Sequence, residues 1–254
     1  MKYILVFCSI IFFQSIATES QSSEYLIKKR QTEVLTHMFD QLVERQIPSE
    51  RSVELSVTAL LKNYPEQIVP VLNIAISKYP NDYEQILCGA LRAEPALTSD
   101  VIDLILQNNI ASKEEVISFA LREEPAYAPE IVNSAISYAP QDMENIIRVA
   151  IITEPVMANN IVNSMMQSYP ERLLDILVIA IKTIPNQVVN IVKNTLRISP
   201  DNSEVVSMAI SSSKDDKTRQ IITAAIKSGF SEEAANTAAI IGGAKESNLV
   251  MLKP

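Results

Sequence analysis

The 254-residue sequence is poor in the residue types from which most active sites are built. It contains one histidine, two cysteines, four glycines and no tryptophan. His37 has Asp40 and Gln41 on the same predicted helix face, but no nucleophile accompanies it, so we interpret it as structural. Scattered glycines cannot form a phosphate-binding loop, and no HExxH, CxxC or DxDxDG pattern is present. The sequence therefore predicts no catalytic residues, no cofactor and no metal site.

The scarcity of glycine and aromatic residues also restricts the fold. Aromatic residues make up 6% of the chain and hydrophobic residues 47%. This composition favours helices over glycine-punctuated sheets, and it is sufficient for a sizeable core. The formal net charge of −8 makes the chain acidic and repels phosphate backbones. We therefore expect an all-α protein that does not bind nucleic acid.

Long apolar runs are missing as well, except at the N-terminus, where residues 1–17 have the pattern of a secretory signal peptide. Lys2 forms a basic region, residues 3–13 form an apolar region, and Ser15 and Ala17 are the small residues before the cleavage point. This apolar run is too short to cross a bilayer, and no later run is longer. The sequence predicts export to the periplasm, the medium or the cell surface, with no transmembrane span in the mature chain.

What the sequence does contain is a ladder of prolines fifteen residues apart. One interval is skipped, where Ile110 takes the proline position and the flanking pattern continues. Because proline fits the first turn of a helix and disfavours helix at the residue before it, each proline is expected to end one helix and begin the next. The ladder consists of Pro65, Pro80, Pro95, Pro125, Pro140, Pro155, Pro170, Pro185 and Pro200.

Between the prolines, apolar residues follow a helical spacing. With each proline as position 1, they fall at positions 4, 7, 8, 11 and 12, which lie on one face of an α-helix. Such a helix is too short to be stable without neighbours, and a small residue at position 11 lets neighbouring helices approach closely. Position 11 is Ala75, Ala90, Ala120, Ala135, Ala150, Ala180 and Ala225.

Alternate units differ, which predicts a helical hairpin as the repeating unit. Units that end in Glu-Pro or Ile-Pro are apolar at position 10 (Phe119, Val149 and Ile179), so we expect them to form the more buried layer. Over residues 50–229 the pattern resembles the α-solenoid class, the architecture of tetratricopeptide and HEAT repeats, without the signature of a specific family. The resemblance implies a right-handed, all-α solenoid of short antiparallel helices, with about 15 residues per helix and about 30 per hairpin.

The regions that flank the repeat are predicted to cap it. Residues 18–49 contain an amphipathic helix from Glu24 to Gln46, which we interpret as an N-terminal capping helix, with dimerisation through this helix as the alternative. In residues 230–254, Ser231 is expected to begin a capping helix that Gly242 ends, followed by a loose tail.

The remaining functional signal is a set of polar residues on the second type of helix, which would form a row in a registered stack. We interpret the row as a binding face for a protein or peptide partner, and the chain as an exported, non-enzymatic scaffold. One alternative is a structural or surface-layer component that self-assembles, and another is a hydrolase with a dispersed site. The row consists of Asn73, Asp103, Asn133, Asn160, Asn163 and Asn190.

Overall fold

The computed structural model describes residues 25–46 and 49–249, and in these residues all regular elements are helices. The predicted signal peptide lies outside the described residues. Contacts divide the chain into two compact units, Met1–Glu94 (unit 1) and Pro95–Pro254 (unit 2). From α2 (Ser52–Asn63) onward, both units are built of short helices that pack on their neighbours in the sequence, which confirms the predicted helical repeat.

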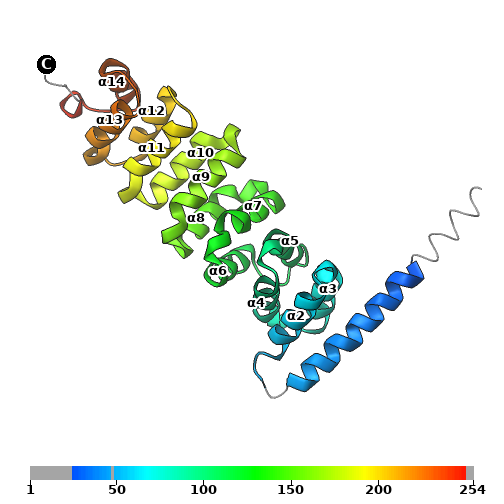
Figure 1. Ribbon diagram of the computed structural model, residues 1–254. Helices are drawn as coiled ribbons and strands as arrows, with labels where there is room; N and C mark the ends of the chain where they lie inside the picture. The colour runs from blue at the N-terminus through cyan, green and yellow to red at the C-terminus, as the bar shows by residue number, and fades with distance from the viewer. Residues whose placement is uncertain (1–24, 47–48, 250–254) are drawn as a thin grey trace, which may run out of the picture. The chain divides into compact units, whose positions relative to one another are not determined.

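The helices follow the fifteen-residue spacing closely, and Figure 1 shows them in chain order. The first described helix of unit 1 spans residues 25–46. The α-helices after it in unit 1 are α2 (Ser52–Asn63), α3 (Ile68–Lys78) and α4 (Tyr83–Ala93). Those of unit 2 are α5 (Thr98–Gln107), α6 (Lys113–Glu123), α7 (Ala128–Tyr138), α8 (Met143–Thr153), α9 (Ala158–Ser168), α10 (Leu173–Thr183), α11 (Val188–Ile198), α12 (Ser203–Ser212), α13 (Thr218–Lys227) and α14 (Glu232–Ile241).

Most prolines open a single turn of 3₁₀ helix rather than the α-helix itself. After α3, for example, the Tyr79 N–H donates to the Ala75 carbonyl at 2.8 Å, and the Tyr79 carbonyl accepts from the Asp82 N–H at 3.0 Å. The chain thereby satisfies its backbone groups while it turns from one helix to the next. The 3₁₀ helices are Pro65–Gln67, Pro80–Asp82, Pro95–Leu97, Pro125–Tyr127, Pro140–Asp142, Pro155–Met157, Pro170–Arg172, Pro185–Gln187, Asp215–Lys217 and Glu246–Asn248.

At the interval where Ile110 replaces proline, a side-chain cap starts helix α6. Asn109 takes a positive φ of 51°, and the side chain of Ser112 then caps α6. The Ser112 hydroxyl accepts from the Glu115 N–H, and the Glu115 carboxylate accepts from the Ser112 N–H at 3.0 Å. This capping box begins α6 at position 4, so the register of the repeat is kept without proline.

The helices of unit 2 are stacked next to one another (Figure 1) and form two layers, and the buried residues of both layers form one core. The helices α5, α7, α9, α11 and α13 pack each on the next and form the odd layer. The helices α6, α8, α10, α12 and α14 do the same and form the even layer, and consecutive helices pack across the two layers. Ala120, Ala135, Ala150, Ala180 and Ala225 are all inaccessible to solvent, as the close-approach interpretation of position 11 requires.

The prediction that one layer is the more buried is wrong. Helices α6, α8 and α10 bury four to six residues each, and α7, α9 and α11 bury five or six. In both layers the buried residues at positions 7, 8, 11 and 12 face the shared core. Of the three apolar residues at position 10, Ile179 is buried, but Phe119 and Val149 are only half-buried, so apolar character at this position does not identify an inner layer.

In unit 1 the helix over residues 25–46 is partly packed. Phe39 is fully buried and lies against Tyr79 with a ring-centroid distance of 6.0 Å, and the Lys78 ammonium donates to Asp40 at 2.7 Å. The earlier part of the helix is exposed, with exposed fractions of 55% for Ile27 and 59% for Val34. The predicted helix is therefore confirmed, whereas its role as a cap remains a prediction.

Candidate interaction surface

The candidate site lies on the solvent-facing side of the odd layer in unit 2. Positions 6, 9 and 13 of each helix point away from the buried residues at positions 7, 8, 11 and 12. Because successive odd helices pack side by side, equivalent positions form rows across them. We call these residues the odd face: Asp100, Asp103 and Gln107 on α5; Glu130, Asn133 and Ser137 on α7; Asn160, Asn163 and Gln167 on α9; Asn190, Lys193 and Arg197 on α11; and Gln220, Thr223 and Lys227 on α13, all exposed or half-buried.

The structure places five of the six predicted residues on this face. Asn160 and Asn190 are exposed, and Asp103 and Asn133 are half-buried. The Asn133 side-chain oxygen accepts a hydrogen bond from the Tyr169 hydroxyl at 2.9 Å, so part of its capacity is used within the fold.

Asn163 belongs to the same row but offers less to a ligand. Its side-chain oxygen is buried and has no hydrogen-bond partner among the described residues. That atom is therefore closed to a ligand on the surface, and the exposed Asn160 and Asn190 are the better candidates for contact.

The sixth predicted residue, Asn73, belongs to unit 1. It is exposed on α3 and lines a groove of about 530 Å³ together with residues of the helix over residues 25–46, among them Thr32 and Thr36. Asn73 therefore lies in unit 1 and is not part of the odd face.

Electrostatics at the α5 end of the odd face oppose ionisation of one carboxyl group. Burial raises the pKa of Asp103, and the nearby charge of Asp100 raises it further, while a hydrogen bond with Ser134 of α7 lowers it. Two carboxylates one helical turn apart give this end a negative character.

Charge changes sign along the odd face. Asp100, Asp103 and Glu130 carry negative charge at α5 and α7, and the three odd-face residues of α9 are uncharged. At the other end, α11 and α13 present Lys193, Arg197 and Lys227, all exposed. The face therefore runs from acidic through amide-rich to basic.

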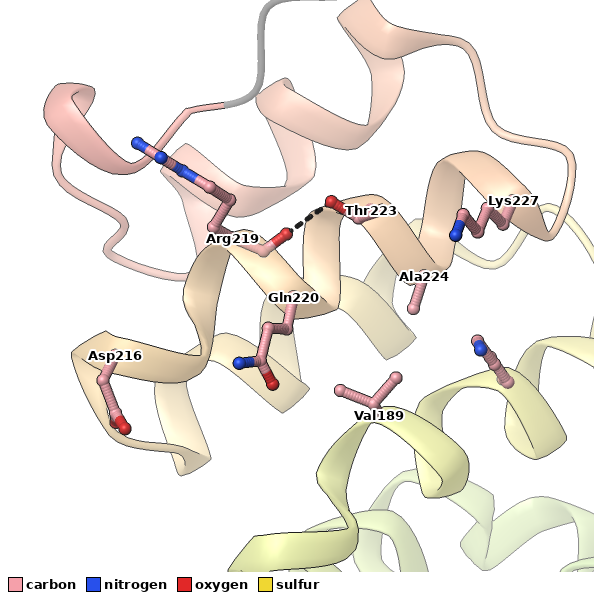
Figure 2. A pocket seen from close by; sticks show the side chains of 8 residues that line it. Val189, Asp216, Arg219, Gln220, Thr223, Ala224 and Lys227 are labelled. Carbon is pink, nitrogen blue, oxygen red and sulfur yellow. Dashed lines mark hydrogen bonds between the residues drawn. The ribbon is translucent and has the colours of Figure 1, made fainter.

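The basic end contains a groove of about 510 Å³ between α11 and α13 (Figure 2). Val189 and Ala224 form an apolar part of its lining, and Gln220 and Lys227 supply polar groups from α13. The Arg219 guanidinium points away from Val189 and donates to the Ser247 carbonyl at 3.0 Å. Lys193, which also lines the groove, and Lys227 are thus its main cationic groups.

Sequence reasoning missed Lys193, Arg197 and Lys227 because it followed one residue type rather than one position. Lys193 stands at position 9, where Asp103, Asn133 and Asn163 stand in earlier units. Reading positions 6, 9 and 13 through all the units would have found these residues and the change of charge.

Two kinds of feature are missing from the part of the chain that the structure describes: a metal-binding cluster and a single membrane-spanning helix. No group of three or more His, Cys, Asp or Glu residues there could hold a metal ion. Nor is any single described helix long and apolar enough to cross a membrane; Pro170–Thr183 and Pro185–Ile198 reach that criterion only as a pair bent by 113°. In comparisons with known proteins, no family model, curated protein or solved structure matches this chain.

Proposed function

We propose that the chain is an exported, non-enzymatic helical-repeat protein that binds an extended segment of a protein partner on its odd face. The observation that carries this proposal is the repetition of polar, solvent-facing residues at the same positions of five adjacent helices. A regular array of this kind matches a ligand that is itself regular, such as an extended peptide.

The chemistry and the spacing of the face both suit a peptide. An asparagine amide both donates and accepts hydrogen bonds, as a peptide group does. Neighbouring helices lie about 8–10 Å apart, and an extended peptide advances about 3.3 Å per residue. About three peptide residues therefore correspond to one helix step, so Asn160 on α9 and Asn190 on α11 can contact successive parts of one segment.

Selection from a library of twelve-residue peptides, followed by fluorescence anisotropy on the purified chain, tests this proposal. The variant Asn160→Ala/Asn190→Ala removes the exposed amides, and we expect it to weaken binding of the selected peptides about tenfold, since each lost hydrogen bond contributes about 0.5–1.5 kcal/mol. The control Glu144→Ala/Lys182→Ala removes two exposed side chains of the even layer without changing the net charge.

Unchanged binding by the control supports the odd face as the binding surface. Equal weakening by both variants would contradict it, as would a failure to select any peptide. Thermal unfolding of both variants establishes that each is folded.

A second candidate function, self-association, is favoured by the exposed apolar residues near the start of the helix over residues 25–46. Tyr25, Leu26, Ile27 and Val34 are each more than half exposed, at 68%, 55%, 55% and 59%. Ile27 and Val34 are seven residues apart and therefore lie on the same helix face, and an exposed apolar face can pair with a second copy of itself. Light scattering after size exclusion tests this candidate: a mass of one chain at all concentrations contradicts it, and a dimer abolished by Ile27→Glu/Val34→Glu supports it.

A further inference from the structure

We propose that the partner segment is itself charge-polarised, with acidic residues seated in the groove between α11 and α13 and basic residues over α5 and α7. This inference rests on the proposed function, because it specifies the ligand of the same face. It goes beyond that function by naming the sequence character of the partner and the place where each end of the segment binds.

The binding place of the partner segment's acidic end is assigned from the groove between α11 and α13. Lys193 and Lys227 line it, and Arg197 is exposed on α11. Asp216 is the one carboxylate of the lining, and it lies 4.0 Å from the Lys217 ammonium, which partly compensates its charge. In a chain of net charge −8, a groove with this lining is complementary to carboxylates rather than to cations.

The binding place of the partner segment's basic end is assigned from the α5 and α7 end of the odd face. Asp100, Asp103 and Glu130 stand on adjacent helices α5 and α7, and the odd-face positions of these two helices carry no cation. A cation over these residues would relieve their repulsion.

The same charge order argues against a uniform polyanion. A nucleic acid or a wholly acidic peptide that filled the groove would continue over α9 to α7 and α5, where Glu130, Asp103 and Asp100 repel it. A segment that is acidic at one end only meets an attractive surface along its whole length.

The spacing of the helices sets the length of the segment. From α5 to α13 there are four helix steps of about 8–10 Å each, a span of about 30–40 Å, which an extended chain covers in about 10–12 residues. The midpoints of the two charged ends are three helix steps apart, about 24–30 Å, so we place the acidic and basic clusters of the partner about seven to nine residues apart.

Four twelve-residue peptides test the inference by fluorescence anisotropy with the full chain. Two carry three Glu at one end and three Lys at the other, in the two chain directions, with a neutral middle. The third has the same composition with the charges alternating, and the fourth is neutral. We expect one polarised peptide to bind about tenfold more tightly than the alternating one, since two or three exposed ion pairs of about 0.5 kcal/mol each give that ratio.

Charge reversal identifies the groove. Lys193→Glu/Lys227→Glu is expected to remove the preference for the polarised peptide, whereas the control Arg148→Glu/Lys182→Glu makes the same change of net charge on the even layer and is expected to retain it. Thermal unfolding shows whether each variant is folded.

Each outcome separates this inference from the proposed function. Equal binding of the polarised and alternating peptides, lost in Asn160→Ala/Asn190→Ala, overturns the inference and leaves the peptide-binding function standing. Binding by none of the four peptides also overturns the inference, and whether peptides selected from the library still bind then decides the proposed function. A concentration-dependent dimer that Lys193→Glu/Lys227→Glu dissociates overturns it too, because the occupant is then a second copy of the chain.

Discussion

Glu54 of α2 is a buried carboxylate, 5% exposed, that joins α2 to α4 in unit 1. Arg51 Nε donates to its Oε2 at 2.7 Å, and Arg92 Nη1 of α4 donates to its Oε1 at 2.8 Å. The hydrogen bond from Arg51 lowers the pKa of Glu54 against the opposing effect of burial, and the Cys88 thiol and the two guanidinium charges lower it further. The two helices approach so closely here that a Cβ on Gly89 would lie 2.5 Å from the Glu54 carbonyl oxygen.

The lowered pKa of Glu54 predicts an acid-sensitive contribution to stability. The ionised carboxylate stabilises the fold above its ordinary pKa of 4.5, and that contribution is lost as the pH falls through the lower folded-state value. At pH 7 we expect Glu54→Gln to cost about 1–3 kcal/mol, and the difference from the wild type to shrink below about pH 4. Urea unfolding at several pH values measures both quantities; a difference that is constant over pH would contradict the assignment.

Ala150 at position 11 of α8 tests the close approach of helices within unit 2. It is inaccessible to solvent, so Ala150→Leu must displace its neighbours, and we expect a loss of about 1–3 kcal/mol. Ala126→Leu makes the same change at an exposed alanine, where little should happen. If thermal unfolding finds the two variants equally stable, position 11 is not a packing constraint.

At the scale of one element, α6 shows how a helix of the repeat keeps its register where the proline is missing. Ser112 caps the helix by accepting from the Glu115 N–H. We expect Ser112→Ala to cost about 1 kcal/mol, whereas Ser137→Ala on the exposed face of α7 should be neutral within about 0.5 kcal/mol. Chemical denaturation of the two variants gives the comparison, and a neutral Ser112→Ala would mean that neighbouring helices alone hold α6 in register.

The helices themselves were predictable, because the fifteen-residue spacing, the apolar face and the helix-forming composition all favour the same structure. The start of α14 after Ser231 and its end at Gly242 also followed from capping residues, and the structure has both. The 3₁₀ turns were not predicted, since proline suits the first residue of either helix type.

The layers and the candidate site were harder to predict from the sequence. Phe119, Val149 and Ile179 suggested an inner layer, but burial depends on the packing of both layers and not on one extra apolar position. Asn160 and Asn190 were placed correctly on a solvent-facing row, whereas Lys193 and Lys227 were overlooked because their importance lies in the groove between α11 and α13, which only packing reveals.

At the scale of the whole molecule, stability is expected to be a sum of repeat and nearest-neighbour contributions. Within unit 2, Pro125–Glu154 contains one helix of each layer, α7 and α8, and removing it joins Glu124 to Pro155, the junction that the chain already makes at Glu124–Pro125. The odd face would become one helix shorter and keep its charge order. Removing 140–154 instead deletes α8 alone and forces every later helix of the unit into the other layer.

The unfolding temperatures of these two deletions test the two-layer repeat most directly. We expect the chain lacking residues 125–154 to unfold cooperatively with its helical circular dichroism retained, and the chain lacking residues 140–154 to unfold at a clearly lower temperature although it has lost fewer residues. Equal unfolding temperatures, or a lower one for the larger deletion, would contradict the thirty-residue hairpin as the unit of this fold.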